Sequence, residues 1–408
     1  ILLHVFYPTL GQNQGNNWYF GDGAGISFNS VAPTSISGGQ TYLGIFSPHS
    51  EASSSISDST GSLLFYSNGE KAWNANHQIM PNGDSIMGNL SSTQGALIIP
   101  EPGSSNIYYL FTTDAFLNNL ANGLRYSKVD MCLDNEFGDV MEGKKNIPLS
   151  SLASEKLIAV NHFNNVDYWI ITHEFNSANF VAYRLTSSGI IDTITSTIGS
   201  VHQEYCGTST APYGSALGQL KASPDGSKLV IMNGQTCYSI SELFDFDIST
   251  GIVSNPLDLL TDSIAVSLYG ASFSPDNSKL YIGSMMNNDN IYQYDLLAGG
   301  GLPSSIIASK TIIHSFMGGP SGCSFQLGPD GIIYVARRNE NFIGAINYTN
   351  LSGISCGYVD NAVSLGGNFC SYDLPNMLDS YNYHSTQVDC ATGISDIANN
   401  KSNLVKIT

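Results

Sequence analysis

A turn-and-strand unit recurs along this chain and constrains its fold more than any other feature. Its clearest copy begins Leu220-Lys-Ala-Ser-Pro-Asp-Gly-Ser-Lys-Leu-Val-Ile-Met and ends, after a polar gap, with Glu242-Leu-Phe-Asp-Phe-Asp-Ile-Ser-Thr-Gly251. Proline fixes φ at the first corner of a turn, and glycine supplies the positive φ that the second corner needs. The Pro-Asp-Gly sequence therefore predicts a hairpin between two short apolar strands, with a third strand after the gap.

Five further copies of this unit follow the same plan. Two are close: Ser274-Pro-Asp-Asn-Ser-Lys-Leu-Tyr-Ile-Gly and Gly328-Pro-Asp-Gly-Ile-Ile-Tyr-Val. Three looser copies lie upstream. The second strands of the six copies are expected to begin near Leu63, Ile107, Tyr168, Leu229, Leu280 and Ile332, in steps of 44, 61, 61, 51 and 52 residues. A period of about 40–60 residues that holds about four strands is typical of propeller blades.

We therefore predict an all-β fold, a single β-propeller of WD-repeat or lactonase-like architecture with seven blades. The six copies account for residues 50–90, 91–150, 151–200, 201–260, 261–312 and 313–360. A composite seventh blade is expected from residues 17–49 and 361–390, with residues 17–29 pairing with a part of 362–384. Closure by N- and C-terminal strands removes a sheet edge that would otherwise invite aggregation. Six and eight blades remain alternatives.

The two ends of the sequence are expected to lie outside the propeller, which would occupy residues 13–390 as a single domain. Residues 1–12 resemble the tail of a secretory signal peptide without its basic region, and an ordinary linker is the alternative. Residues 391–408 have a polar middle rich in asparagine and are predicted to be a linker. No apolar run reaches the roughly 20 residues that a membrane span needs. We expect a soluble, exported protein without a membrane span.

The charge of the chain bears on its partners. Only 15 Lys and Arg residues accompany 33 Asp and Glu residues, so the net charge is −18. Binding to nucleic acid depends on neutralising phosphates with basic groups, so this composition argues against a nucleic-acid partner. It also disfavours an anionic membrane surface.

Seven cysteines leave the redox state open. None falls in a C-x-x-C pair, so neither a zinc ribbon nor a thioredoxin-like site is supported. Up to three disulfides are possible in an oxidising compartment. Cys356 and Cys370, and Cys206 and Cys237, are among the nearer pairs in sequence, but spacing does not determine connectivity.

Several longer motifs carry a family resemblance. They are Asn16-Asn-Trp-Tyr-Phe-Gly, Gly61-Ser-Leu-Leu-Phe-Tyr-Ser-Asn-Gly, Trp73-Asn-Ala-Asn-His-Gln-Ile-Met-Pro-Asn-Gly, Ser91-Ser-Thr-Gln-Gly-Ala-Leu-Ile-Ile-Pro and Asp167-Tyr-Trp-Ile-Ile-Thr-His. With them, about residues 13–350 resemble the propeller-like ectodomain of surface proteins that Bacteroidota export through the type IX secretion system.

This resemblance implies a secreted protein, extracellular or attached to the outer-membrane surface, that meets the type IX machinery during export. It also implies that residues 391–408 lead toward a C-terminal sorting domain that this sequence lacks. Residues 361–384 depart from the pattern. The family supplies no chemistry that carries over to this chain.

Three histidines are the candidate metal ligands. His162, His173 and His202 fall in a 41-residue window, with Glu174 inside it. Neutral imidazoles and a carboxylate suit zinc, and an imidazole can also act as a general base. The spacing matches no compact metal motif, and the alternative is that these side chains cap blade strands.

Two further sets of residues are candidates for ligand contact. Asn287, Asn288 and Asp289 place several oxygens in a row and are a candidate loop for a structural calcium ion, with a plain hairpin connection as the alternative. Trp18 and Trp73 are candidates for stacking on sugar rings, with packing in the core as the alternative. No cofactor besides calcium is expected.

No catalytic residue can be assigned, because no G-x-S-x-G elbow or phosphate loop appears. We therefore expect an exported cell-surface propeller that acts as a binding, adhesion or assembly module, with a surface protein or glycan as partner. The alternative is a propeller hydrolase or lyase, of lactonase or glycan-cleaving type, with its site in the central channel. Acids or histidines gathered on the innermost strands favour the enzyme, and a large flat apolar patch favours binding.

Overall fold

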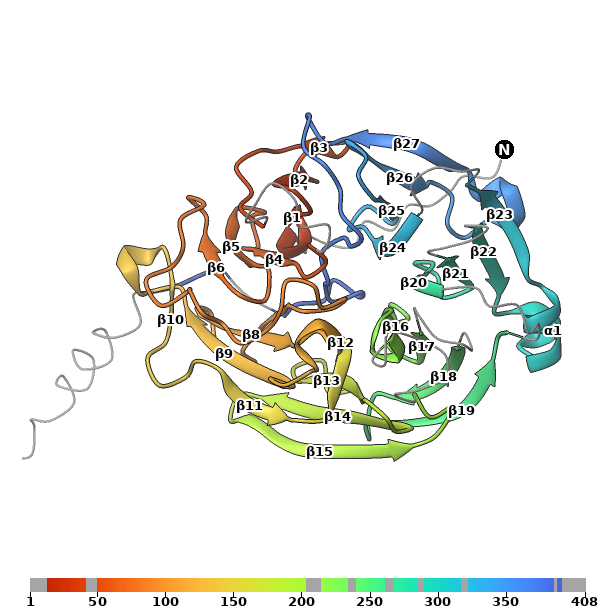
Figure 1. Cartoon of the computed structure of the whole chain (residues 1–408), viewed down its shortest axis with the longest axis horizontal. Coiled ribbons are helices and arrows are strands. Elements are labelled where there is room, and N and C mark those ends of the chain that lie inside the picture. The colour runs from red at the N-terminus through yellow and green to blue at the C-terminus, as the bar shows by residue number, and fades with distance from the viewer. Residues whose placement is uncertain are drawn as a thin grey trace, which may run out of the picture.

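The computed structural model describes residues 13–41, 50–202, 214–233, 240–260, 268–284, 290–316, 322–384 and 387–390. Their strands form seven antiparallel sheets, which stand like blades around one axis (Figure 1). The predicted seven-bladed β-propeller is thus confirmed. Within the described part of the chain, no helix is long and apolar enough to cross a membrane.

Four blades have four strands each, and in each of them the chain runs from the innermost to the outermost strand. Their strands are β12 (Ala153–Asn161), β13 (Tyr168–Glu174), β14 (Asn179–Thr186) and β15 (Gly189–Thr197); β16 (Leu220–Ala222), β17 (Lys228–Met232), β18 (Ser241–Asp247) and β19 (Ile252–Asp258); β20 (Leu268–Phe273), β21 (Lys279–Ser284), β22 (Asn290–Asp295) and β23 (Thr311–Ser315); and β24 (Gly322–Leu327), β25 (Ile333–Arg337), β26 (Phe342–Ile346) and β27 (Tyr358–Ser364).

The other three blades are less regular. Two have three strands: β1 (Asn17–Phe20), β2 (Ala24–Ser27) and β3 (Thr34–Ser35); and β4 (Ser54–Ser57), β5 (Leu63–Ser67) and β6 (Ala72–Asn74). The third comprises β7 (Leu97–Pro100), β8 (Ile107–Thr113), β9 (Leu124–Asp130), β10 (Asp139–Val140) and β11 (Ile147–Ser150), the last two both pairing with β9. Helical turns lie in the connections: α1 (Pro303–Ala308), η1 (Asn13–Gly15), η2 (Phe116–Asn118), η3 (Asp134–Glu136), η4 (Gly214–Ala216), η5 (Ala298–Gly300) and η6 (Gly353–Cys356).

The turn chemistry acts as expected. The second corner of the three close copies has a positive φ, at Gly226 (74°), Asn277 (61°) and Gly331 (80°). Glycine adopts this conformation without steric cost, and asparagine tolerates it. At Gly226 the space is also restricted, because a Cβ would lie 2.6 Å from Val160 Cγ1.

The closure of the ring differs from the prediction. The blade β1–β2–β3 is built from N-terminal residues alone, and residues 358–364 form the outer strand β27 of the preceding blade. Among the described residues, the backbone link between the N-terminal blade and residues 362–384 is one isolated bridge, Asp22 to Phe369. The predicted pairing of these two segments is therefore present as a single bridge, and in the described part of the chain no strand of residues 362–384 joins the sheet β1–β2–β3. The reason is that residues beyond Ser371 find their partners in the channel instead.

The apolar core lies between neighbouring blades. One cluster joins Ile158, Trp169 and Phe180 of one blade to Leu229 and Phe244 of the next. Each sheet buries both faces in this way, since it packs against a neighbour on either side. Repetition around the axis stabilises the ring and leaves the channel as the place where the blades meet.

Candidate functional site

The central channel is filled by the chain's own C-terminal segment, residues 371–384, which we call the plug. It forms no strand and runs through the centre of the ring as the blue coil in Figure 1. The innermost strands all run in one direction, so the ring has an upper end, where they begin, and a lower end, where they finish. Asp373 contacts Tyr269 near the beginning of β20, and Tyr381 donates to the carbonyl of Leu327 at the end of β24. The plug therefore passes from the upper to the lower end.

Asn376 fixes the middle of the plug. Its Nδ2 donates to the carbonyls of Ala96 (3.2 Å) and Leu157 (2.8 Å), and its Oδ1 accepts from Gln94 Nε2 (3.3 Å). Its backbone N–H donates to the carbonyl of Ser53 at 2.8 Å. The side chain and the backbone N–H of this one residue thus join three neighbouring blades. Buried polar groups destabilise a fold unless they are hydrogen-bonded, and here the Asn376 amide and the carbonyls that face it are bonded to one another.

An acidic pair lies at the upper end. Tyr269 Oη contacts Glu51 Oε2 (3.1 Å) and Asp373 Oδ2, and all three side chains are buried. Desolvation, reinforced by the neighbouring acids, raises the pKa of both Glu51 and Asp373 well above the ordinary range. A phenol carries a single hydrogen, so it can donate to only one of the two carboxyls. The other carboxyl gains no hydrogen from Tyr269, and burial disfavours its charged form.

A buried ion pair holds the lower end of the plug. Lys221 Nζ lies 3.1 Å from Asp379 Oδ1 and 2.5 Å from Gln326 Oε1, and Gln326 Nε2 donates to the same Asp379 oxygen at 3.1 Å. Lys221 is 1% exposed. A buried charge requires such a partner, because an unpaired ion in the interior is strongly destabilising.

A cavity of about 280 Å³ opens beside this end of the plug. We call it the basal cavity. Two blades and the plug enclose it, and its lining comprises Ala159, Val160, Asn161, His162, Asn165, Ala222, Ser223, Pro224, Asp225, Gly226, Ile248, Leu378, Asp379, Ser380 and Asn382. Its volume lies close to the lower limit of small-molecule sites, which are usually concave with a few placed polar groups.

His162 is the polar group of this cavity whose hydrogen bonding is incomplete. Its Nδ1 accepts the Asn164 backbone N–H at 3.0 Å, so the hydrogen of the ring is on Nε2. That Nε2 is buried and has no partner among the described residues. The side chain as a whole is 7% exposed.

The structure brings two of the three predicted histidines together. The rings of His173 and His202 lie 4.2 Å apart at the upper end of their blade, whereas His162 lies beyond the opposite end of β13. A single ion would not reach all three. Within the described residues, no group of three His, Cys, Asp or Glu side chains is placed to hold a metal.

Burial governs the chemistry of the upper histidines. Desolvation, and then the Lys156 ammonium, lowers the pKa of His173 to about 3. Desolvation likewise takes the pKa of His202 well below its usual value. The same burial lowers the pKa of Lys156 to about 7, and its Nζ donates to the carbonyls of Ala216 and Leu217. Both imidazoles are therefore neutral packing groups in this structure.

The predicted calcium loop and the two predicted sugar-stacking tryptophans remain to be placed in the structure. Asn287, Asn288 and Asp289 lie outside the described residues. Trp18 is 0% exposed and packs against Tyr334, and Trp73 is 2% exposed and stacks on Tyr66. Both tryptophans are core residues, and neither ring has a face open to a ligand.

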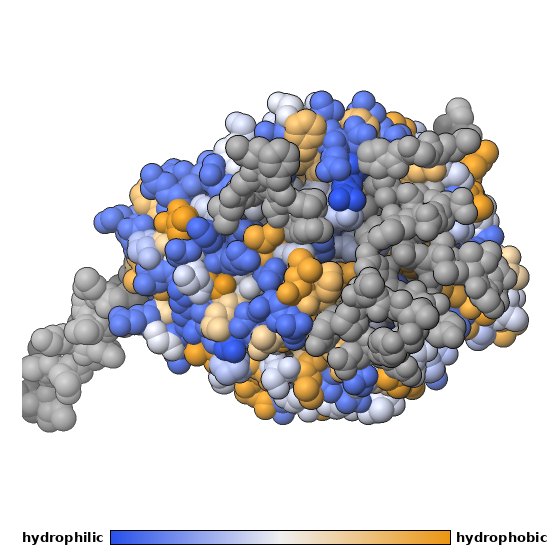
Figure 2. Space-filling model, viewed as in Figure 1, coloured by the Kyte–Doolittle hydropathy of each residue, from blue (hydrophilic) through white to orange (hydrophobic). Residues whose placement is uncertain are grey.

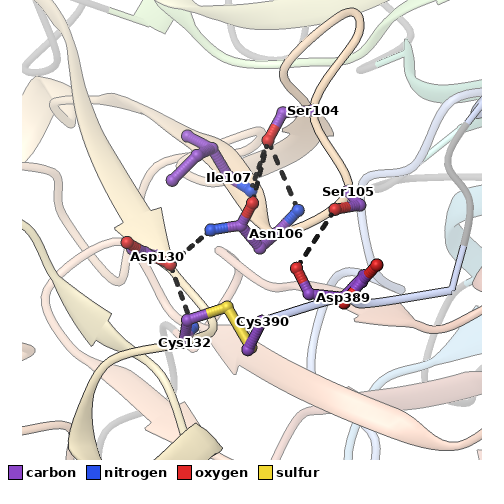
Figure 3. The surroundings of a disulfide bond; sticks show 8 residues. All are labelled: Ser104, Ser105, Asn106, Ile107, Asp130, Cys132, Asp389 and Cys390. Carbon is purple, nitrogen blue, oxygen red and sulfur yellow. Dashed lines mark hydrogen bonds between the residues drawn. A yellow bond between two sulfur atoms is a disulfide. The ribbon is translucent and has the colours of Figure 1, made fainter. Parts of the chain in front are cut away.

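A disulfide fastens the chain beyond the plug. Cys390 is bonded to Cys132, 258 positions earlier, in the turn between β9 and β10. Figure 3 shows Asp389 beside it, with its carbonyl accepting from Ser105 Oγ at 3.4 Å. Cys356 and Cys370 are free and buried, so this nearer pair is not bridged. Cys206 and Cys237 lie outside the described residues.

The plug residues were the functional feature that sequence reasoning missed. Asp373, Asn376 and Asp379 recur at intervals of three residues, in a stretch that lacks the turn-and-strand pattern of a hairpin. The sequence signal for the plug is this regular spacing of polar residues between apolar ones, in a region that departs from the repeat. That signal does not show which strands these groups meet.

Comparison with known proteins bears on the fold. No protein-family model matches the chain, and no curated protein matches it. A solved protein from Lactobacillus plantarum has a TM-score of 0.50 at 12% identity, with 88% of this chain and 98% of that chain covered. A putative 6-phosphogluconolactonase from Bacteroides uniformis has a TM-score of 0.49 at 13% identity, with 86% and 98% covered. The periplasmic gluconolactonase of Pseudomonas aeruginosa has a TM-score of 0.49 at 11% identity, with 88% and 98% covered.

The likeness is one of fold. At these identities it transfers neither activity nor substrate to this chain.

Proposed function

We propose that this protein is an exported propeller that works as a binding or adhesion module at the cell surface, with a surface glycan or protein as its partner. The plug is the observation that carries this proposal. A propeller enzyme with its site in the central channel needs that channel for substrate, and here residues 371–384 occupy it with buried Leu374, Met377 and Leu378. What remains for recognition are the two faces of the ring and the basal cavity.

The disulfide supports export. Such bonds form and persist in secreted and periplasmic proteins and are rare in the reducing cytosol. The motif resemblance to surface proteins of the type IX secretion system points the same way and adds the secretion machinery as a transient partner. These are expectations about location, and fractionation of the native host tests them directly.

The coloured part of one face does not single out a docking surface. Figure 2 shows hydrophobic and hydrophilic residues interleaved there, without one continuous apolar area in the part drawn in colour. Recognition by small polar contacts suits such a surface better than a large hydrophobic interface does.

A binding assay with the intact protein tests the proposal. Labelled protein should bind a glycan array or surface extracts saturably, and an excess of unlabelled protein should compete. Absence of binding to glycans and surface proteins alike would contradict it. The second candidate, a hydrolase or lyase, rests on the raised pKa values of the Glu51 and Asp373 carboxyls. Turnover of lactone or glycan substrates that Asp373→Asn abolishes would favour that candidate.

A further inference from the structure

We propose that this protein forms a two-fold dimer through the outer rim of two neighbouring blades, where a second copy of the chain covers an exposed apolar surface. We call this surface the rim patch, and it comprises Ile312, Tyr348, Leu351, Ile354 and Val359. The inference goes beyond the proposed binding function and does not depend on it, because such a dimer leaves both faces of each ring free.

The rim patch is a group of exposed apolar side chains. Its five members are between 44% and 80% exposed. They come from β23 and β27, which are the outermost strands of neighbouring blades in Figure 1, and from the connection before β27 that contains η6. Two more exposed leucines, Leu297 and Leu302, lie in the connection before β23. Single exposed apolar residues are normal on a soluble protein, whereas a group of them marks an interaction surface.

Hydrogen bonds hold the connection that contains η6 against the neighbouring blade. Gln293 of β22 accepts from the Gly353 N–H at 2.8 Å and donates to the Leu351 carbonyl at 2.8 Å. In the sheet, Gln293 pairs with Thr311, the residue before Ile312. Leu351 and Ile312 therefore lie on either side of one bonded glutamine, although they belong to different blades.

A second contact joins the two outermost strands. The rings of His314 in β23 and Tyr358 in β27 have centroids 4.6 Å apart, and Val359 follows Tyr358 in the chain. The members of the rim patch are thus carried by one connected piece of structure. A surface that is ordered before its partner arrives loses little entropy on association.

The charge of this region indicates a second copy as the partner. Residues 296–359 contain three basic and two acidic residues, a net charge of +1, whereas the whole chain carries −18. Residues 296–329 contain one charged residue, Lys310, and residues 341–359 contain none. Two copies repel each other over an acidic surface, so the rim patch is where they can approach with least repulsion. Depletion of charge is typical of the centre of an interface.

Two-fold symmetry suits such a surface. In a two-fold dimer the same patch faces itself, so no complementary groove is needed elsewhere on the molecule. A specific interface buries about 800 Å² of each partner. The rim patch would form its centre with Tyr348 as the aromatic anchor, and Leu297 and Leu302 would extend it toward the border.

A rim dimer would also affect recognition. It presents two copies of each face of the ring, so a partner that is dense on a surface could be held by both chains at once. The second contact is then intramolecular and raises the overall affinity without any new interaction.

Sedimentation velocity of the intact protein tests the dimer. We expect a species of twice the 43.7 kDa of one chain, with concentrations from about 1 μM to about 1 mM covering strong and weak association. Ile354 is 80% exposed, so Ile354→Asp leaves the core unchanged and places a carboxylate in the interface of each copy. It should raise the dissociation constant at least about tenfold.

A matched pair of isoleucines provides the control. Ile312 in β23 and Ile191 in β15 both lie on outermost strands, and they are 51% and 52% exposed. Ile312→Asp should weaken the dimer, and Ile191→Asp, in another blade, should not. Unchanged circular dichroism spectra show that each variant is folded. A dimer that persists in both rim variants, or that Ile191→Asp weakens equally, would overturn the inference.

Salt separates an apolar interface from one held by ion pairs. Salt screens the repulsion between two acidic copies, so the dimer should become tighter as ionic strength rises. Dissociation by salt would overturn the rim patch as the interface. Native protein that is monomeric at every concentration would overturn the dimer itself, and saturable binding of a surface partner by that monomer would leave the proposed function standing.

Discussion

Asn376 in the plug and Leu157 in β12 are 219 positions apart in the sequence and are joined by a hydrogen bond of 2.8 Å at the centre of the ring. The same amide also donates to Ala96, in the preceding blade. The innermost strands of a propeller expose backbone carbonyls to the channel, and water would normally satisfy some of them. In this protein a side chain from the C-terminal segment does so.

Replacing Asn376 by alanine should destabilise the fold by about 3 kcal/mol, because it removes the side-chain donor to two buried carbonyls and the acceptor of one hydrogen of the Gln94 amide. Urea unfolding at equilibrium measures the change. The control is Asn368→Ala, which removes a single bond to Gly23 in a partly exposed position and should cost about 1 kcal/mol or less. Similar losses in the two variants would contradict the central role of Asn376.

Removing the Cys132–Cys390 disulfide should lower stability by several kcal/mol. The chain-entropy model gives up to about 5 kcal/mol for a closed loop as long as this one. We expect the double variant Cys132→Ser/Cys390→Ser to unfold at lower urea and to be insensitive to dithiothreitol, whereas the reductant should bring the native protein to the same midpoint. A reductant effect of equal size in the double variant would show that another bond is responsible.

The acidic pair predicts a loss of stability with rising pH. Because the folded pKa values of Glu51 and Asp373 exceed the ordinary ones, the native state holds more protons than the unfolded chain above about pH 4.5. Their contribution is full below the unfolded pKa values and falls as pH rises through the folded ones. Asp373→Asn removes one titration, so its stability should vary less between pH 5 and pH 8.

The buried histidines give the stability the opposite pH dependence. The quantity to compare is therefore the difference in stability between native protein and Asp373→Asn at each pH. The pKa values of His173 and His202 are lowered in the fold, so their contribution grows as pH rises through the unfolded value near 6.5. Both proteins carry these histidines, and their effect cancels. Identical pH profiles for native protein and Asp373→Asn would contradict the raised pKa of Asp373.

His173 should remain uncharged at pH 5. Its pKa of about 3 means that its imidazole signals in an NMR titration stay unchanged from pH 7 to pH 5, and His173→Gln identifies them by their loss. The same protein in concentrated urea is the control, because an unfolded histidine titrates near pH 6.5. A midpoint near 6 in the folded protein would mean that water reaches the pair.

Local turn chemistry made the blades predictable. The second strands begin at Leu63, Ile107, Tyr168, Lys228, Lys279 and Ile333, each within one residue of the expected position. Proline, aspartate and glycine in sequence determine such a turn without reference to the rest of the chain.

The plug and the basal cavity could not be predicted from local turn chemistry, because they depend on contacts between distant parts of the chain. Ser54 Oγ donates to the carbonyl of Asn376 across 322 positions, and Tyr168 Oη donates to that of Tyr383 across 215. Spacing along the chain contains no information about partners so distant. The contact between His173 and His202 could have been predicted, because both residues flank one blade. The separation of His162 from them could not, because it depends on which end of β13 each residue occupies.

The disulfide has a mechanical consequence. A pull on the chain beyond Cys390 meets the covalent link to Cys132 before it meets any hydrogen bond of the plug. The load passes into the turn between β9 and β10 and spreads along a strand that is bonded over its whole length to β8. The plug is thereby shielded from tension, and the ring can be tethered from its C-terminal side without being unthreaded.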